Sequence, residues 1–218
     1  MSRPSALLWD HDGVLVDTEP VYYEATRATL AGVGIDLPRP SYLRLMADGV
    51  GYFGEARERG MSDAAIAALR ESRNALYQRL LRTAPIDIPG VEDVLMYLAR
   101  SHRMAIVTTS RGDDFELIHR TRTLTRHFEL ILTREDYVRS KPAPDPYLRA
   151  LELLGVSRAD AVVIEDSERG LRSAVAAGVR CIVIRSEFTQ THDFSGAWRH
   201  VDSLDQIAPL LTDTTARE

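Results

Sequence analysis

Short, mostly apolar runs, each ended by polar residues, recur along this chain and predict the strands of a sheet. The first is Ala6–Trp9, and later runs lie at Met104–Val107, Glu129–Leu132, Ala161–Ile164 and Arg180–Ile184. Runs of this length fit strands that are buried on both faces. Segments with helical periodicity separate the later runs, as in parallel sheets. We therefore predict an α/β fold with a doubly wound, Rossmann-like parallel sheet.

The stretch between the first two runs has helical patterning and no strand-like run. Its clearest helix is predicted over Asp63–Leu81, where apolar residues recur at helical spacing. A proline-rich segment at residues 85–90 then breaks the chain. We predict that residues 19–87 form an inserted helical cap domain, and that residues 1–18 and 88–218 form the Rossmann-like catalytic core.

Composition limits the class of protein and its partners. The 218 residues are 44% hydrophobic and 27% charged, which is ordinary for a globular protein. A net charge of −5 gives no reason to expect nucleic-acid binding, and no apolar run approaches the roughly 18 residues of a membrane span. We expect no signal peptide, and the single cysteine, Cys181, fits a reducing cytoplasm. The oligomeric state stays open, a monomer being compatible with this composition.

Two carboxylates, Asp10 and Asp12, follow the first predicted strand directly and precede Gly13. Residues two apart in an extended segment point to the same side. Two like charges held so close repel each other unless a cation lies between them. A turn after the strand explains one aspartate but does not require both. This pattern favours a functional site over a plain turn.

Other predicted strands also end in polar groups. The second run ends in Thr108, Thr109 and Ser110, and the fourth ends in Glu165 and Asp166. Taken separately, a strand-end hydroxyl and the start of a helix need no catalytic explanation. In an open α/β sheet, however, ligands bind outside the carboxyl ends of the strands. We therefore expect these side chains to share one site with the two aspartates.

Lys141 is the single lysine among 27 Lys and Arg residues. Alone it would be interpreted as a surface residue, but a compact ammonium can act as a point charge between several oxygens. With the strand-end groups it completes the requirements of phosphoryl transfer: a nucleophile, a cation, hydrogen-bond donors and an acid for the leaving oxygen. Carboxylates at two strand ends also suit Mg²⁺.

The motif Asp-x-Asp-Gly-Val-Leu-x-Asp-Thr-Glu at residues 10–19 resembles the first motif of the haloacid dehalogenase superfamily, in particular its β-phosphoglucomutase-like branch. The resemblance covers the α/β part, with four motifs in family order. It implies that Asp10 is the nucleophile, Asp12 the general acid/base, and Thr108 and Lys141 the groups that hold the phosphoryl group. The implied Mg²⁺ ligands are Asp10, Asp12 (through its backbone carbonyl), Glu165 and Asp166.

The predicted cap departs from the mutase pattern. Tyr52, in Gly49-Val50-Gly51-Tyr52, stands where the mutase has an arginine for a second phosphate. Arg73, in a stretch similar to one in the mutase, is either an anion-binding residue or a solvated helix charge. We assign Tyr52 and Arg73, with Thr109 and Ser110 of the core, to substrate binding. The cap has no lysine for a Schiff base, which excludes a phosphonoacetaldehyde hydrolase, and Asp12 excludes a haloacid dehalogenase.

The sequence thus predicts a Mg²⁺-dependent phosphatase that hydrolyses a small phosphorylated metabolite, such as a sugar phosphate, through an aspartyl phosphate. A β-phosphoglucomutase-type phosphotransferase is one alternative. A non-catalytic binding or regulatory protein on the same fold is another, because fold does not determine function.

Overall fold

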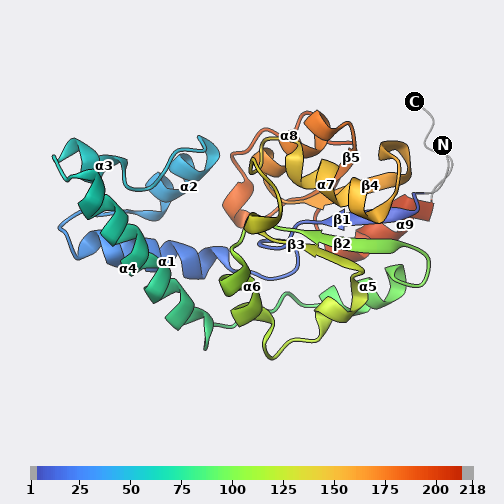
Figure 1. Cartoon of the computed structure of the whole chain (residues 1–218), viewed down its shortest axis with the longest axis horizontal. Coiled ribbons are helices and arrows are strands. Elements are labelled where there is room, and N and C mark those ends of the chain that lie inside the picture. Colours follow the sequence, from blue (N-terminus) through green and yellow to red (C-terminus); the bar gives the residue numbers. More distant parts are fainter. Residues whose placement is uncertain (1–3, 213–218) are drawn as a thin grey trace. The chain divides into compact units, whose positions relative to one another are not determined.

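The computed structural model describes residues 4–212, which divide into two compact units. Among the described residues, one unit comprises 4–16 and 87–212, and the other 17–86. Within the described residues, six parallel strands of the first unit form one sheet in the order β3-β2-β1-β4-β5-β6 (Figure 1). The strands are β1 Ala6–Trp9, β2 Arg103–Val107, β3 Leu130–Leu132, β4 Ala161–Glu165, β5 Arg180–Ile184 and β6 Arg199–Val201.

Helices connect the strands of the core unit and make up most of the other unit. The α-helices are α1 Glu19–Ala31, α2 Arg39–Ala47, α3 Gly54–Glu58, α4 Asp63–Leu81, α5 Val91–Leu98, α6 Gly112–His119, α7 Asp145–Leu154, α8 Glu168–Ala177 and α9 Ile207–Thr212. The 3-10 helices are η1 Leu124–His127, η2 Arg134–Asp136, η3 Arg158–Asp160, η4 Glu187–Thr189 and η5 Leu204–Gln206. In the described part of the chain, no helix is long and apolar enough to cross a membrane.

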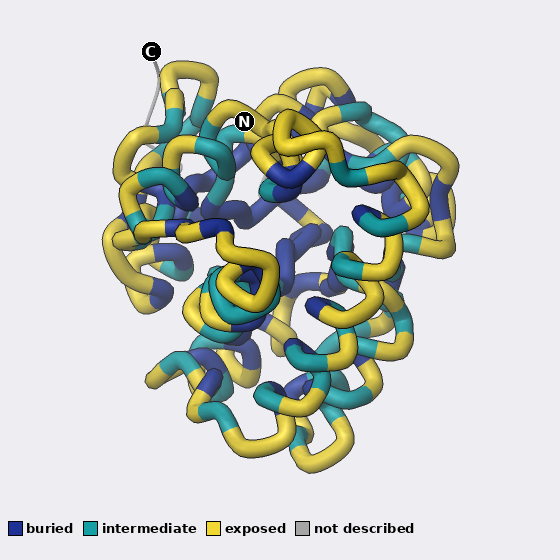
Figure 2. Tube along the Cα trace, turned by 90° about the vertical axis from the view of Figure 1, so that its left-hand side faces the viewer, coloured by how far each residue is buried: buried dark blue, intermediate teal, exposed yellow. Residues whose placement is uncertain are grey.

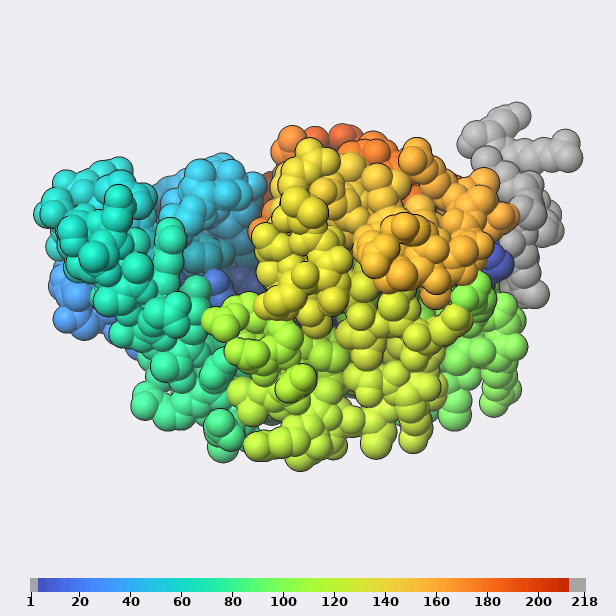
Figure 3. Space-filling model, viewed as in Figure 1, coloured from blue at the N-terminus to red at the C-terminus, as the bar shows by residue number. Residues whose placement is uncertain are grey.

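The central strand β1 is buried on both faces, as its unbroken apolar run requires. Leu7 and Trp9 point to the side covered by α5, α6 and α9, whereas Ala6 and Leu8 point to the side of α7 and α8. Figure 3 shows the segment from η2 to α7, in yellow to orange, at the surface of the core unit. This two-sided burial confirms the predicted doubly wound α/β fold.

The order of the strands determines where a site can form. β1 pairs with β2 on one side and with β4 on the other, so the chain reverses its direction of winding at β1. Such a reversal leaves a crevice at the carboxyl ends of the two neighbouring strands. The residues that directly follow β1 and β2, and those at the end of β4, therefore lie together.

Two local features do not follow from the sequence pattern. Thr18 occupies the N-cap position of α1, but its side chain makes no capping hydrogen bond, because its backbone is already in a helical conformation. The strand β6 was not expected from the sequence, since its three residues, Arg199–Val201, carry two charged or polar side chains and a single valine. β6 pairs with β5 at the edge of the sheet, where one polar face is tolerated.

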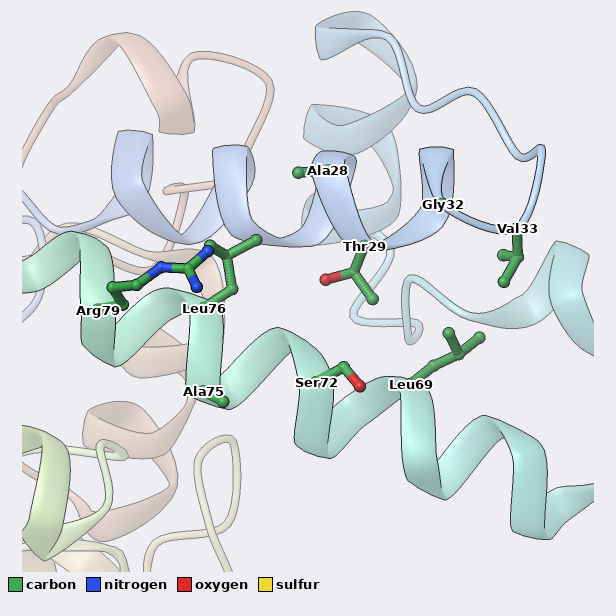
Figure 4. A pocket seen from close by; sticks show the side chains of 9 residues that line it. All are labelled: Ala28, Thr29, Gly32, Val33, Leu69, Ser72, Ala75, Leu76 and Arg79. Atoms are coloured by element: carbon green, nitrogen blue, oxygen red, sulfur yellow. The ribbon is translucent and has the colours of Figure 1, made fainter.

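The helical unit, residues 17–86, is organised around α1 and α4, which pack along each other. Buried and exposed positions alternate with the helical turn, as the colours in Figure 2 show. Between the two helices lies a pocket of about 410 Å³, lined by small and apolar side chains with Arg79 at one end (Figure 4). Since Arg79 is the one charged residue that lines it, this pocket offers no catalytic chemistry.

Candidate active site

The first aspartate lies one residue beyond β1, and the backbone around it is held by the neighbouring strand. The N–H of Asp10 donates to the carbonyl of Ile164 in β4 at 2.9 Å, which extends the β1–β4 pairing by one residue. Gly13 then turns the chain with a φ of +84°. A Cβ at Gly13 would lie 2.1 Å from Oδ2 of Asp166, so glycine is needed both for the turn and for this close approach.

Lys141 joins three strand ends through its ammonium group. Nζ donates to Oδ1 of Asp10 at 2.6 Å, to Oε1 of Glu165 at 2.7 Å and to the carbonyl of Val107 at 2.8 Å. These three acceptors match the three protons of an ammonium. The side chain is 2% exposed, so the single lysine of the chain is a buried cation rather than a surface charge.

Opposed charges determine the protonation of this cluster. Burial, and next the charge of Glu165, raises the pKa of Asp10 to about 7, while Lys141 acts in the opposite direction. Burial alone would raise the pKa of Glu165, but the ammonium of Lys141 outweighs it and the pKa lies below its ordinary value. Burial would likewise lower the pKa of Lys141, yet the two carboxylates raise it above its ordinary value. A further cation beside Asp10 would therefore favour the ionised, nucleophilic form of that carboxylate.

Three buried carboxylates are close enough to share one cation. Oxygen atoms of Asp10, Glu165 and Asp166 lie within 4.8 Å of one another. These donors are all hard oxygens, which suits Mg²⁺ better than a softer metal. The carboxylate of Asp12 is not part of this group. The prediction for Asp12 was that its backbone carbonyl, rather than its carboxylate, binds the metal.

Glu165 also organises the loop that leads into α8. Its Oε2 accepts from the backbone N–H of Asp166 and from both the N–H and the hydroxyl of Ser167, at 3.0 to 3.2 Å. Its Oε1 accepts from Tyr147 at 2.8 Å as well as from Lys141. Ser167 in turn caps α8 by accepting from the N–H of Gly170. Glu165 therefore holds both the ammonium of Lys141 and the loop before α8 in place.

The second aspartate lies among hydroxyl groups. Oδ2 of Asp12 accepts from the hydroxyl of Ser110 at 2.6 Å and from that of Thr108 at 3.2 Å, and the Nδ1 of His11 lies 3.2 Å away. Thr108 is held by Tyr137, whose hydroxyl donates to the Thr108 carbonyl at 2.6 Å. The predicted residues Asp12, Thr108 and Ser110 are thus in direct contact.

The remaining predicted site residues differ in their surroundings. Thr109 accepts from the guanidinium of Arg169 at 3.4 Å, near the same strand end. Tyr52 and Arg73 belong to the helical unit. There the ring of Tyr52 stacks on that of Tyr42, with centroids 4.5 Å apart, and the guanidinium of Arg73 lies 4.2 Å from the ring centroid of Tyr22. Arg73 is buried against the ring of Tyr22, so it is not a solvated helix charge.

Four residues around the site were not singled out from the sequence: Tyr137, Tyr147, His11 and His119. Tyr147 lies in the first turn of α7, six residues after Lys141, and reaches Glu165. His11 stands between the two aspartates, and its Nε2 lies 2.8 Å from the Nε2 of His119, at the end of α6. An imidazole between two carboxylates was the one available signal, whereas Tyr137, Tyr147 and His119 are found only through their contacts.

The chain is similar to known proteins in sequence and in structure. Residues 7–184 match the family described as haloacid dehalogenase-like hydrolase. The chain is 37% identical over 210 residues to Protein CbbY of Rhodobacter capsulatus, covering 90% of this chain and 92% of that one. It is 29% identical over 184 residues to the phosphorylated carbohydrates phosphatase of Thermotoga maritima, covering 81% and 83% of the two chains. The structure of CbbY from Rhodobacter sphaeroides in complex with xylulose-(1,5)bisphosphate is similar with a TM-score of 0.78 and 29% identity, over 92% and 95% of the two chains.

Proposed function

The chain belongs to the haloacid dehalogenase-like hydrolases, and from this premise we propose that it is a Mg²⁺-dependent phosphatase that hydrolyses a small phosphorylated sugar through an aspartyl phosphate at Asp10. The predicted superfamily and the predicted enzyme class, a phosphatase, are confirmed by the family match and by relatives that are named phosphatases. The observation that carries the mechanism is the contact of the one lysine, Lys141, with both Asp10 and Glu165.

In the first step, an oxygen of Asp10 attacks the phosphorus of the substrate, and the bond from phosphorus to the leaving oxygen breaks. Lys141 favours the charged form of Asp10 and offers its positive charge to the phosphoryl oxygens. The hydroxyl of Thr108, which lies 3.2 Å from Asp12, turns to donate to the remaining oxygens, while the closer hydroxyl of Ser110 stays on Asp12. Burial of Asp10 and Lys141 keeps water from screening these charges.

Asp12 supplies the proton in this mechanism. It protonates the leaving oxygen in the first step and removes a proton from water in the second. That water attacks the phosphorus of the aspartyl phosphate, inorganic phosphate leaves, and the carboxylate of Asp10 is restored. The hydroxyl of Ser110, which donates to Asp12 at 2.6 Å, orients it for both transfers.

Mg²⁺ would be held by Asp10, by Asp166 and Glu165, and by the backbone carbonyl of Asp12. Bound there, it would neutralise charge on the phosphoryl oxygens and orient the group for attack. The buried carboxylates fit such a cation, because burial, and next the charge of Glu165, raises the pKa of Asp10, and a bound cation would offset both effects.

The substrate class rests on the helical unit and on the relatives. We infer that residues 19–87 act as the cap, with Tyr52 and Arg73 as its substrate-binding residues. Tyr52 offers a ring and a hydroxyl, which suits a hydroxylated sugar body, whereas Arg73 offers a cation for a second anionic group. A relative that binds xylulose-(1,5)bisphosphate and another named for phosphorylated carbohydrates support a sugar phosphate. The cytoplasm remains the expected compartment.

The alternative of a mutase needs a firm grip on a second phosphate at the cap. The position of the mutase arginine is taken by Tyr52, which is stacked on Tyr42 and carries no charge. Arg73 would then have to supply this grip alone. Hydrolysis is therefore favoured over phosphoryl transfer between two positions of one sugar.

The test is hydrolysis of phosphorylated metabolites and of an aryl phosphate with Mg²⁺, before and after chelation. Asp10→Asn should lower kcat by about 10³-fold or more, because an amide is a poor nucleophile. Asp113→Asn, on the exposed side of α6, is the matched control and should leave kcat unchanged. Near-normal turnover by Asp10→Asn would refute the covalent mechanism, and no turnover by the wild type would favour a non-catalytic binding protein.

A further inference from the structure

A pair of histidines lies directly behind the residue proposed as general acid/base. His11 is fully buried, although it stands between two carboxylates at the mouth of the sheet. Its side chain points toward α6, with Nδ1 near the carboxylate of Asp12 and Nε2 near His119. There its ring contacts Phe115, with centroids 5.0 Å apart, and His119.

The donor and the acceptor of each hydrogen bond in this pair can be assigned. Oδ2 of Asp12 also accepts from two hydroxyls, so the Nδ1 of His11, 3.2 Å away, donates to it. The Nε2 of His11 then accepts from the Nε2–H of His119, 2.8 Å away. This leaves Nδ1 of His119 as a lone pair, and that buried atom has no partner among the described residues. The reverse tautomer of His119 would bury an unpaired N–H, which costs more than an unused acceptor.

His119 is well suited to this role because it stays neutral. Burial, and next the neighbouring His11, lowers the pKa of His119 to about 3. The ring of Phe115 packs against that of His119, with centroids 4.4 Å apart. The pair is therefore a fixed set of dipoles, in which His119 selects the tautomer of His11 and His11 contacts Asp12.

We propose that His119 and His11 are positioning residues for Asp12, holding its Oδ2 so that Oδ1 exchanges the proton with the leaving oxygen and with water. This inference rests on the proposed phosphatase function and adds two residues to it. Three donors, from His11, Ser110 and Thr108, converge on Oδ2, and those of His11 and Ser110 remain there when Thr108 turns to the substrate. An oxygen that already accepts these hydrogen bonds is a poor site for a proton, so the proton resides on the other oxygen. In a Ser-His-Asp triad, a carboxylate orients a catalytic imidazole. Here an imidazole orients a catalytic carboxylate.

The experiment compares phenyl phosphate, whose leaving oxygen needs a proton, with 4-nitrophenyl phosphate, whose leaving oxygen does not. His11→Leu should lower kcat for phenyl phosphate by roughly tenfold or more, the scale found for residues that orient a reacting group, and should affect 4-nitrophenyl phosphate much less. His11→Asn keeps a donor near the position of Nδ1 and should restore part of the loss. His119→Gln keeps a donor near Nε2 and should be close to wild type, whereas His119→Leu should follow His11→Leu in direction.

A double-mutant cycle separates positioning from a merely structural role. If His11 acts through Asp12, then His11→Leu should not lower kcat further in an Asp12→Asn background, measured with phenyl phosphate, the substrate on which the single change has its large effect. Phe115→Leu is the control, because it removes packing around both rings without removing a hydrogen bond. It should lower the thermal stability but leave the ratio of the two substrates unchanged.

Two outcomes would overturn the inference, and they are distinguishable. Equal losses for both substrates in His11→Leu and His11→Asn, or additive losses in the Asp12→Asn background, would reduce the pair to packing while the phosphatase reaction stands. A wild-type protein that hydrolyses neither substrate with Mg²⁺ would overturn the proposed function and this inference with it. Thermal unfolding shows whether each variant is folded. If His11→Leu does not fold, the comparison of His119→Leu with His119→Gln still tests the inference.

Discussion

Gly170 lies directly against the carboxylate of Glu165: a Cβ at Gly170 would be 1.7 Å from Oε1 and 2.1 Å from Oε2. The glycine is the third residue of α8, and its N–H donates to the capping hydroxyl of Ser167. Glu165 holds Lys141 through one of these oxygens. Because Gly170 has no side chain, the carboxylate of Glu165 has room to reach the ammonium of Lys141.

Gly170→Ala should displace Glu165 and with it Lys141. We expect a loss of about 1–3 kcal/mol in the free energy of unfolding from overpacking, and a clear fall in kcat. Gly112→Ala is the matched control, since a Cβ there would meet its nearest neighbour at 3.6 Å in the first turn of α6. Denaturant unfolding and steady-state kinetics measure the two effects. Wild-type behaviour of Gly170→Ala would mean that Glu165 can move without consequence.

Lys141→Arg should not be a conservative change. The ammonium of Lys141 is surrounded by three acceptors at 2.6 to 2.8 Å, and a planar guanidinium needs more room. We expect a fall in kcat of roughly 10²-fold, the scale for removal of a preorganised electrostatic contact. Arg139→Lys, at an exposed ion pair with Asp145, controls for the exchange of the two cations. Unchanged kinetics of Lys141→Arg would make the single lysine a compositional accident.

Metal removal should be reversible and should depend on Asp166. Chelation should abolish activity and added Mg²⁺ should restore it. Mg²⁺ at 100 times its Kd should also stabilise the fold by about 2.7 kcal/mol, because it binds the folded state alone. Asp166→Asn should raise the Mg²⁺ concentration needed for both effects, whereas the exposed Asp202→Asn should not. A thermal shift that is equal in wild type and Asp166→Asn would locate the metal elsewhere.

Arg73 should matter for substrates with a second charge. Its guanidinium is buried against Tyr22 and donates to Asn74 at 2.9 Å. Arg73→Ala should raise KM for sugar bisphosphates more than for sugar monophosphates, and the exposed Arg70→Ala on the same helix should do neither. A screen of phosphorylated sugars with wild type, Arg73→Ala and Tyr52→Ala measures this. Interconversion of hexose 1- and 6-phosphates, dependent on Arg73 and a bisphosphate, would indicate a mutase.

Cys181 should be chemically inert in the folded protein. Burial raises the pKa of its thiol well above the ordinary value, so almost no thiolate forms at pH 8. A thiol reagent should label Cys181 only after unfolding, which makes labelling a readout of global opening. Val138→Cys, at a position that is 84% exposed, should react at once and serves as the positive control. Rapid labelling of native wild type would show that β5 opens locally.

The alternation of apolar runs and helices was enough to predict the architecture of this protein. Each buried strand must be apolar along its whole length, and a parallel sheet requires a long connection between strands, so both features leave a pattern in the sequence. The same pattern placed Asp10, Thr108 and Glu165 at strand ends. It failed for β6, where three residues at a sheet edge are too few to show a period.

What only the tertiary structure decided are the contacts between side chains that are distant in sequence. His11 and His119 are separated by 108 positions, and no local pattern marks the end of α6 as the partner of the first motif. The same holds for Tyr147, which contacts Glu165, and for Gly170. From the sequence alone, Gly170 would be interpreted only as a residue of low helix propensity. Local propensity and periodicity report the environment of the backbone, whereas these contacts depend on which faces the completed sheet brings together.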